Sequence, residues 1–210
     1  MRRRMLMVKN GGGNKVEYEF VDLGLSVKWA TCNIGATKPE ESGLYFQWGD
    51  TQGWTAEQVA NGEKVFDWEH YKWCNGSINT ITKYNDDPYN GIVDNKFTLD
   101  IEDDAAHVLI GGGARMPTKE EYEELLKGCT YVEIANYNGS GIGGILFTSK
   151  QDTSKTLFFP HTSVYRNSVL WTRTFDSYGL CFVFDTRIDY VDTDTDNRCS
   201  GHVVRAVLPK

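Results

Sequence analysis

An acidic run near the C-terminus, Asp192-Thr-Asp194-Thr-Asp196-Asn197, has a spacing that could bind a cation. Its carboxylates alternate along the chain, as they do at the start of a calcium-binding loop. An EF-hand loop needs Gly at its sixth place and Glu at its twelfth, and Asn197 and Val203 stand at those places here. We therefore expect a solvated acidic loop and assign no metal site, with a looser calcium site as the alternative.

A glycine-rich run, Gly139-Ser-Gly-Ile-Gly-Gly144, formally matches the dinucleotide-binding pattern GxGxxG. Such a site requires a helix directly after the glycines, because the helix N-terminus holds the pyrophosphate. The next residues, Ile145-Leu-Phe-Thr-Ser149, are typical of a strand instead. The run therefore predicts a hairpin turn, and we expect no cofactor.

The residues that could act as nucleophiles or bind zinc show no catalytic spacing. The histidines, His70, His107, His161 and His202, are far apart, and no pair has the i, i+4 spacing of a helical metal site. The five cysteines contain no CxxC pair, which predicts buried thiols. There is no GxSxG motif. We expect no enzyme, although a triad assembled only in space stays open.

The composition favours one globular domain rich in strands and turns. The 210 residues are 40% hydrophobic and 13% aromatic, with 21 Gly and a net charge of -7. This charge argues against nucleic acid or an anionic membrane as the partner. No apolar run approaches the roughly 18 residues of a membrane span, and the apolar stretch 5–8 is too short for a signal peptide. We expect a flexible tail over 1–14 and a single domain over 15–210.

The hydrophobic pattern predicts an α+β domain with short helices in the middle and a twisted antiparallel sheet that gathers both ends. A helix is expected over 100–108, and the capping box Thr118-Lys-Glu-Glu121 opens another over 120–127. The aromatic residues of 49–98 are expected to bury themselves in satellite cores. Strands are expected at 16–22, 25–32, 43–48, 131–137, 144–149, 156–160, 168–173, 179–185 and 202–207.

The composition changes abruptly in the last quarter of the chain. Residues 156–207 contain no Lys, Glu, Gln or Met, yet they hold six Asp and five Arg. Strand propensity does not explain this absence, because Asp is itself a poor strand former. Randomising only the adenines of AAC or AAT codons does explain it, since such codons never reach Lys, Glu, Gln, Met or Trp. Trp171 is the one residue of that set in the segment, so 156–207 is a candidate variable region.

Several segments resemble known families. Residues 21–33, 39–49, 99–106 and 115–119 resemble the major-paralogous-domain surface proteins of gut Bacteroidetes, first named from Fibrobacter. The end, Arg198-Cys-Ser-Gly201-His-Val-Val204-Arg-Ala-Val207, resembles the closing motif Arg-x-x-Gly-x-x-Val-Arg-Ala-Val of variable proteins from diversity-generating retroelements. The resemblance covers about residues 16–208. It implies a C-type-lectin-like fold, close to that of formylglycine-generating enzymes, in a receptor on a cell surface or a virion, as in phage receptor binding in the human gut.

The chain also departs from these families. Trp171-Thr-Arg-Thr174 stands where the family has Trp-Ser-Ser-Thr, and 162–168 is shorter than the family's glycine-rich loop. The triplets Glu-Pro-Asn and Trp-Asn-Asp of calcium lectins are absent, so calcium-dependent sugar binding is not implied. The paired C-terminal cysteines of formylglycine-generating enzymes are absent too.

We expect the C-terminal segment to form a ligand-binding face on a rigid scaffold. In the strand 179–185, Leu180, Phe182 and Phe184 should enter the core, and the alternate residues should point the other way. Aromatic residues would supply rigid contact area and charged residues oriented polar contacts. The expected ligand-binding residues are Arg173, Phe175, Asp176, Tyr178, Cys181, Val183, Asp185, Arg187, Asp189, Tyr190, Asp192, Asp194, Asn197 and His202.

The expected partner is a protein or another cell-surface ligand, because this acidic face suits neutral or basic surfaces better than nucleic acid. Three alternatives stay open. The chain could be a non-diversified surface or glycan-binding protein of the same fold, an enzyme of the formylglycine-generating kind, or the tip module of a fibre.

Overall fold

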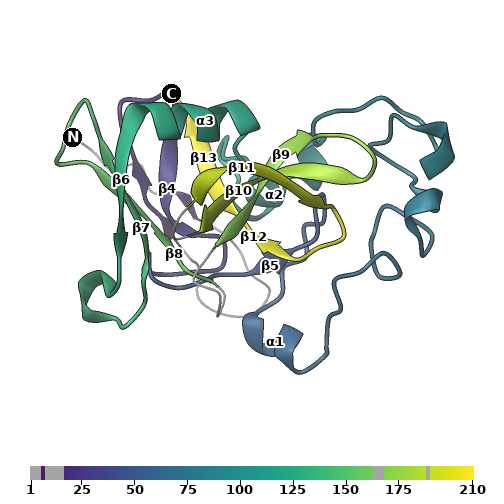
Figure 1. The fold of residues 1–210 in the computed structure, drawn as a ribbon, viewed down its shortest axis with the longest axis horizontal. Coiled ribbons are helices and arrows are strands. Elements are labelled where there is room, and N and C mark those ends of the chain that lie inside the picture. Colours follow the sequence, from purple (N-terminus) through teal and green to yellow (C-terminus); the bar gives the residue numbers. More distant parts are fainter. Residues whose placement is uncertain (1–5, 8–16, 163–167, 188–189) are drawn as a thin grey trace.

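The computed structural model describes residues 6–7, 17–162, 168–187 and 190–210, and antiparallel strands make up most of its regular structure (Figure 1). The helices are short and lie between the N-terminal and C-terminal strands in the chain. The α+β class expected from the sequence is therefore confirmed.

The central sheet carries most of the candidate binding residues. Its strands lie in the order β11–β10–β9–β12–β5, with bounds Tyr190–Asn197, Leu180–Arg187, Val169–Phe175, His202–Val203 and Tyr45–Phe46. β9, β10 and β11 form an antiparallel meander, whereas β12 runs parallel to β9. The turn between β9 and β10 requires Gly179, because its φ of 79° is left-handed and a Cβ there would lie 3.0 Å from the ring of Trp68.

A second sheet joins the two ends of the domain, as the sequence predicts. Its order is β13–β4–β3, with bounds Arg205–Pro209, Val27–Asn33 and Phe20–Val21. A short β1 (Leu6–Met7) pairs with β2 (Glu17–Tyr18). The rest of the predicted tail 1–14 lies outside the described residues.

The third sheet contains the glycine-rich run. Its strands β6, β7 and β8 span Cys129–Ile134, Gly144–Ser149 and Thr156–Pro160. β6 and β7 pair antiparallel, with Ile134 opposite Gly144. The short helix η4 (Tyr137–Gly139) lies in their connection. The run is therefore a hairpin connection, which confirms the prediction, and a strand rather than a helix follows the glycines.

The capping box at Thr118 begins α3 (Lys119–Gly128) as predicted. Glu121 N donates to Thr118 Oγ1 at 3.3 Å, and Thr118 N donates to Glu121 Oε2 at 2.9 Å. The predicted helix over 100–108 is instead divided into η3 (Ile101–Asp103) and α2 (Ala105–Ile110). The division occurs at Asp104, whose side chain accepts from His107 N at 3.0 Å and caps α2.

The loops between β5 and α2 contain helices that the hydrophobic pattern did not reveal. α1 (Ala56–Ala60) begins with a capping box of Thr55 and Gln58, and none of its residues is buried. The other two are the short helices η1 (Ile78–Thr80) and η2 (Pro88–Asn90). A helix without an apolar face leaves no periodicity to read, so only its cap was visible in the sequence.

The prediction of an acidic loop at 192–197 is wrong, because these residues belong to β11. β11 pairs with β10 along its whole length, from Asn197 opposite Leu180 to Tyr190 opposite Arg187. Each aspartate accepts from the backbone N–H of the next residue, and the first of these bonds joins Asp192 Oδ1 to Thr193 N at 2.7 Å. These local bonds and the cross-strand pairing outweigh the low strand propensity of Asp.

Buried side chains form two core clusters, and the β9–β10 strands contribute to both. One cluster includes Trp48, Tyr84, Trp171 and Phe175. The other lies under α3 and includes Trp29, Tyr122 and Phe184. Tyr122 stacks on Phe184 with ring centroids 4.3 Å apart. The central sheet is therefore covered on both faces over most of its area.

Two arginines of the closing motif lie fully buried and tie it to the scaffold. Arg198 donates to Tyr71 Oη, Tyr84 O and Lys83 O at 2.6–2.8 Å. Arg205 donates to Asn33 Oδ1, Ala30 O and Phe158 O at 2.9–3.1 Å. The guanidinium group of each arginine donates several hydrogen bonds to scaffold acceptors. These bonds allow two charged residues of the closing motif to lie in the core.

The aromatic residues of 49–98 mostly pack inward. Tyr71 and Tyr84 are buried around Arg198, and Trp54, Trp68 and Trp73 are half-buried, whereas Tyr89 is 88% exposed. The expectation that these aromatic residues bury themselves is therefore confirmed except at Tyr89 and the 48% exposed Phe97. They do not form a separate satellite core, because Tyr84 belongs to the main cluster around Trp48 and Trp73 packs against it.

The predicted buried thiols are also found. All five cysteines are free, and four of them are buried, with Cys74 half-buried. No helix in the described part of the chain is long and apolar enough to cross a membrane.

Candidate ligand-binding surface

The pairing of β10 with β11 decides which candidate residues share a surface. Residues directly opposite each other in an antiparallel pair point to the same face. Three such pairs, Asp185–Asp192, Val183–Asp194 and Cys181–Asp196, therefore define one face of the central sheet. We call it the carboxylate face.

The Cys181 end of the carboxylate face is covered, so the prediction that Cys181 contacts a ligand is wrong. Cys181 is 0% exposed and belongs to the core cluster that contains Trp48. Phe175 lies in the same cluster, with its ring 5.9 Å from that of Phe97, and is also wrongly assigned to the ligand. The prediction assumed a sheet with one solvated face, whereas the loops after β5 cover this end.

The expected core residues of β10 face the other side of the sheet, towards α3. Phe184 is fully buried there against Tyr122. Phe182 is only half-buried, with the Lys119 ammonium 4.3 Å from its ring centroid, and Leu180 is half-buried as well. The prediction is therefore confirmed for Phe184 and is too strong for its two neighbours.

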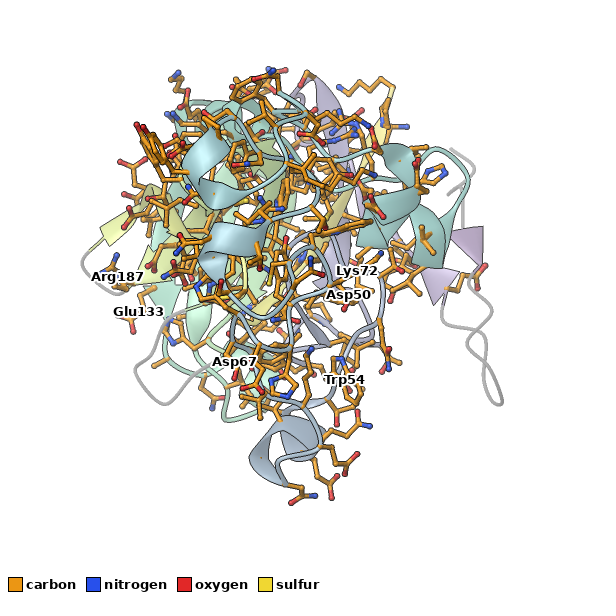
Figure 2. All side chains as sticks on the ribbon, turned by 90° about the vertical axis from the view of Figure 1, so that its right-hand side faces the viewer. Asp50, Trp54, Asp67, Lys72, Glu133 and Arg187 are labelled. Carbon is orange, nitrogen blue, oxygen red and sulfur yellow. The ribbon has the colours of Figure 1, made fainter. Side chains whose placement is uncertain are left out.

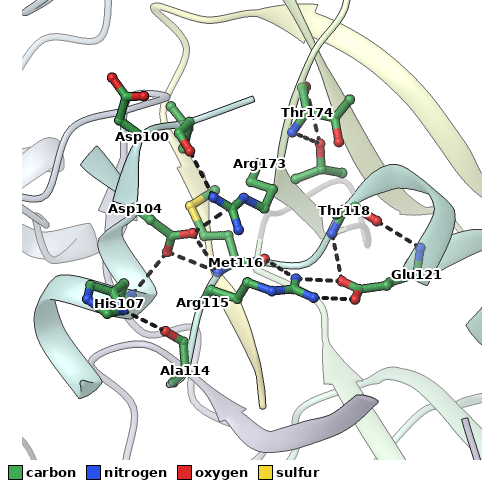
Figure 3. Close-up of polar contacts among 12 residues, drawn as sticks. Asp100, Asp104, His107, Ala114, Arg115, Met116, Thr118, Glu121, Arg173 and Thr174 are labelled. Atoms are coloured by element: carbon green, nitrogen blue, oxygen red, sulfur yellow. Dashed lines mark hydrogen bonds and ion pairs between the residues drawn. The ribbon is translucent and has the colours of Figure 1, made fainter. Parts of the chain in front are cut away.

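Arg173 points into the scaffold rather than towards a ligand (Figure 3). Its Nη2 donates to Leu99 O at 2.8 Å, and its Nε lies 3.9 Å from the buried Asp104 carboxylate. Asp104 in turn accepts from the backbone N–H groups of His107 and Met116. Arg173 therefore links β9 to the N-terminus of α2, and its assignment to the ligand is wrong.

The Asp185 end of the carboxylate face is open and hollowed. A depression of about 230 Å³ lies there, lined by Val169, Val183, Asp185, Arg187, Asp194, Thr195 and Asp196. Arg187 lies at the edge of the molecule, well away from Asp67 and Trp54 (Figure 2). Four of the lining residues, Val183, Asp185, Arg187 and Asp194, are among those the sequence predicted.

Asp185 is the most unusual group in the depression. It is only 6% exposed. Its Oδ2 pairs with Arg187 Nε at 2.9 Å, whereas its Oδ1 is buried without a hydrogen-bond partner among the described residues. Burial raises the pKa of this carboxyl above its usual value of 3.8, and Arg187 offsets only part of that effect. A buried acceptor without a donor is costly, which is characteristic of a site that a ligand completes.

The other carboxylates of the depression are already paired. Asp194 Oδ2 lies 3.3 Å from Arg187 Nη2. Asp196 Oδ2 lies 2.6 Å from His202 Nε2. Burial raises the pKa of Asp196, but the hydrogen bond and the charge of His202 outweigh it and keep the pKa below its usual value. His202 also packs on Trp171 with ring centroids 4.6 Å apart, so it braces Asp196 from the core side.

The remaining predicted residues divide into three groups. Tyr178 at the tip of the β9–β10 turn is 65% exposed, and Asp192 and Asn197 are exposed on β11. Asp176 is half-buried. Asp189 lies outside the described residues, and so does the side chain of Tyr190.

The predicted ligand-binding residues did not include the lining residues Val169, Thr195 and Asp196. Val169 lies opposite Asp185 in the β9–β10 pairing, so knowledge of the register would have found it. Thr195 was hidden because its segment was expected to be a loop.

The alternative of a calcium site at 192–196 gains no support from the geometry. Within the described ranges, one group of acidic or histidine ligands gathers closely enough for a metal ion, namely Asp67, Glu69 and His70. The β11 aspartates are not among them, because a strand spreads alternate residues along its length.

Comparison of the chain with models of protein families, with curated proteins and with solved structures finds no match.

Proposed function

We propose that this chain is a non-enzymatic ligand-binding protein of the receptor or adhesin type, which holds its ligand at the open end of the carboxylate face. The observation that carries the proposal is Asp185, a buried carboxylate that lines a surface depression and has one oxygen without a hydrogen-bond partner in the described structure. Among the buried side-chain atoms that the described structure leaves without a hydrogen bond, Asp185 Oδ1 is the one whose residue lines the depression.

The separation of exposed and buried residues supports this proposal. Arg187, Asp192 and Asp194 are exposed at the open end, whereas Tyr178 and Asn197 are exposed at the opposite end of the β10–β11 pair. Their strands are anchored by buried neighbours such as Trp171 and Phe184. Side chains at such exposed positions can change without disturbing the core, as in other binding sites carried by a rigid scaffold.

The burial of Cys181 supports a non-enzymatic role. Burial raises the pKa of this thiol well above its usual value, so it is held as the poorly nucleophilic thiol. The formylglycine-generating alternative needs a reactive cysteine pair in this region, whereas Cys181 and Cys199 are free, buried thiols whose pKa values are raised by burial.

The proposal includes the family suggested by the sequence, a C-type-lectin-like variable protein whose segment 156–207 is diversified. Arg198 and Arg205 of the closing motif are buried anchors, as fixed positions in a variable segment should be. Sequencing the DNA beside the gene tests this part. A near-identical repeat that differs from codons 156–207 only at adenines supports it, and differences spread over all four bases contradict it.

A pair of displayed libraries tests the binding role itself. One library randomises the three residues exposed at the open end, Arg187, Asp192 and Asp194, and the matched control randomises the three exposed residues 131–133 of β6. Both should remain folded, because exposed substitutions usually change stability by less than about 0.5 kcal/mol. Only the first should yield binders to a panel of proteins. Equal yields from both libraries, or unfolding of the first, would refute the proposed site.

A further inference from the structure

The depression is too small for a whole small-molecule ligand. Its volume is about 230 Å³, whereas pockets for such ligands usually hold about 300–1,000 Å³. Its lining combines two apolar side chains, Val169 and Val183, with three carboxylates and Arg187. This combination fits one long side chain of a partner, with an aliphatic stem and a charged head.

The hydrogen bonds within the depression leave one acceptor for that head. Both oxygens of Asp194 are used, by Thr195 N at 2.8 Å and by Arg187. Both oxygens of Asp196 are used, by Asn197 N at 2.6 Å and by His202. Among the carboxylate oxygens of the residues that line the depression, Asp185 Oδ1 is the one without a donor in the described part of the chain.

The charge of the depression selects a cation. Three carboxylates line it against one guanidinium, that of Arg187. An anionic head would meet uncompensated like charge, whereas an ammonium or guanidinium would donate a charge-assisted hydrogen bond to Asp185. A divalent metal ion fits less well, because within the described residues only Asp67, Glu69 and His70 bring three ligand atoms within 4.8 Å of one another.

We propose that the depression binds one basic side chain, lysine or arginine, of a protein partner, with its stem against Val169 and Val183 and its charged head at Asp185. This proposal rests on the proposed function and specifies the chemistry of the ligand. The burial of Asp185 strengthens this contact, because the electrostatic attraction between a carboxylate and a cation is stronger where water is excluded than at an exposed site.

Titration with single residues tests the proposal directly. N-acetyl-L-arginine amide and N-acetyl-L-lysine amide are added to the nitrogen-15-labelled chain, and backbone amide shifts are followed. At least one of them should give saturable shifts at Val183, Asp185 and Asp194. The uncharged N-acetyl-L-citrulline amide should give none. Asp185→Asn should weaken the binding about tenfold or more, because it removes the charge that the head pairs with.

The matched control is Asp152→Asn, which removes the same charge from an exposed turn that does not line the depression. It should bind like the unaltered chain, and the dispersion of each spectrum shows that both variants are folded. Equal binding by Asp185→Asn, stronger shifts from calcium chloride, or binding of N-acetyl-L-aspartate amide instead would overturn the proposal. If the libraries yield binders and these probes fail, only the pocket assignment is wrong, whereas failure of both sets refutes the binding role.

Discussion

Asp185 shows how a single residue can favour binding at the expense of stability. Its carboxylate is buried, and only one of its oxygens, Oδ2, pairs with Arg187. Burial raises the pKa of this carboxyl. The folded protein therefore holds this proton more tightly than the unfolded chain does. Since the ionised group is disfavoured on folding, its contribution to the free energy of unfolding falls as the pH rises from below 3.8 through the folded-state pKa.

Asp185→Asn should consequently raise the free energy of unfolding at neutral pH while it weakens binding of a basic ligand. The difference between variant and unaltered chain should grow as the pH rises from about 3 to 7. Urea denaturation across that range measures it. A variant that is less stable than the unaltered chain at neutral pH would mean that the Arg187 pair outweighs the burial of the charge.

Arg198, unlike Asp185, contributes to stability rather than to binding, because its Nε, Nη1 and Nη2 all donate hydrogen bonds to the scaffold. Arg198→Met removes the three hydrogen bonds that Tyr71 Oη, Tyr84 O and Lys83 O accept from the guanidinium group. Each buried acceptor left unpaired costs about 1–3 kcal/mol, so we expect a loss of at least about 3 kcal/mol. The control Lys127→Met, at a side chain that is 78% exposed, should cost less than about 1 kcal/mol. Equal losses in chemical denaturation would show that Arg198 is not an anchor.

The β9–β10 hairpin separates binding and packing between neighbouring positions. Phe175 packs on Trp48 and Phe97, whereas Tyr178 projects from the turn three residues later. Phe175→Ala should cost about 3–5 kcal/mol through the cavity it leaves. Tyr178→Ala should stay within about 0.5 kcal/mol. Thermal unfolding of the two variants checks the contrast, and a large loss at Tyr178 would contradict the exposed role of the turn.

The start of α3 depends on a local cap rather than on the sheet. Thr118→Ala removes the acceptor for Glu121 N and should cost about 1 kcal/mol. Thr118→Ser, which keeps the hydroxyl, should restore most of it. Denaturation midpoints of the two variants provide the measurement, and equal losses would assign the effect to the methyl group.

The elements that sequence reasoning found are those with local signals. The capping box of α3, the glycine hairpin and the strands 144–149 and 156–160 each carry their own pattern, and the structure reproduces them. β11 was missed because Asp opposes a strand locally, and only its pairing with β10 decides the outcome.

The candidate site was found only in part for a similar reason. The segment was identified by its composition, and the predicted residues Val183, Asp185, Arg187 and Asp194 do line the depression. Cys181, Phe175 and Arg173 were misplaced, because period-two alternation tells which face a residue points to but not whether loops cover that face. The covering residues, Trp48 and Tyr84, are more than 80 positions away in the chain.

At the scale of the whole molecule, two core clusters hold the central sheet from both sides and leave one end of one face open. The cluster under α3 supports β10 through Phe184, and the cluster around Trp48 closes the Cys181 end. The open end thus rests on a scaffold whose stability comes from elsewhere. This arrangement is the physical basis of the central claim, that ligand binding is confined to the open end of the carboxylate face.

Hydrogen exchange on a bound complex tests that claim most directly. Peptides selected from a displayed random library against the unaltered chain provide the ligand, and exchange is compared with and without the selected peptide. We expect protection in 183–187 and 190–197, with no change in 49–98, and a basic residue in the peptide consensus. Protection confined to 49–98, with β10 and β11 exchanging as in the free chain, would contradict the account and place the site on the aromatic loops.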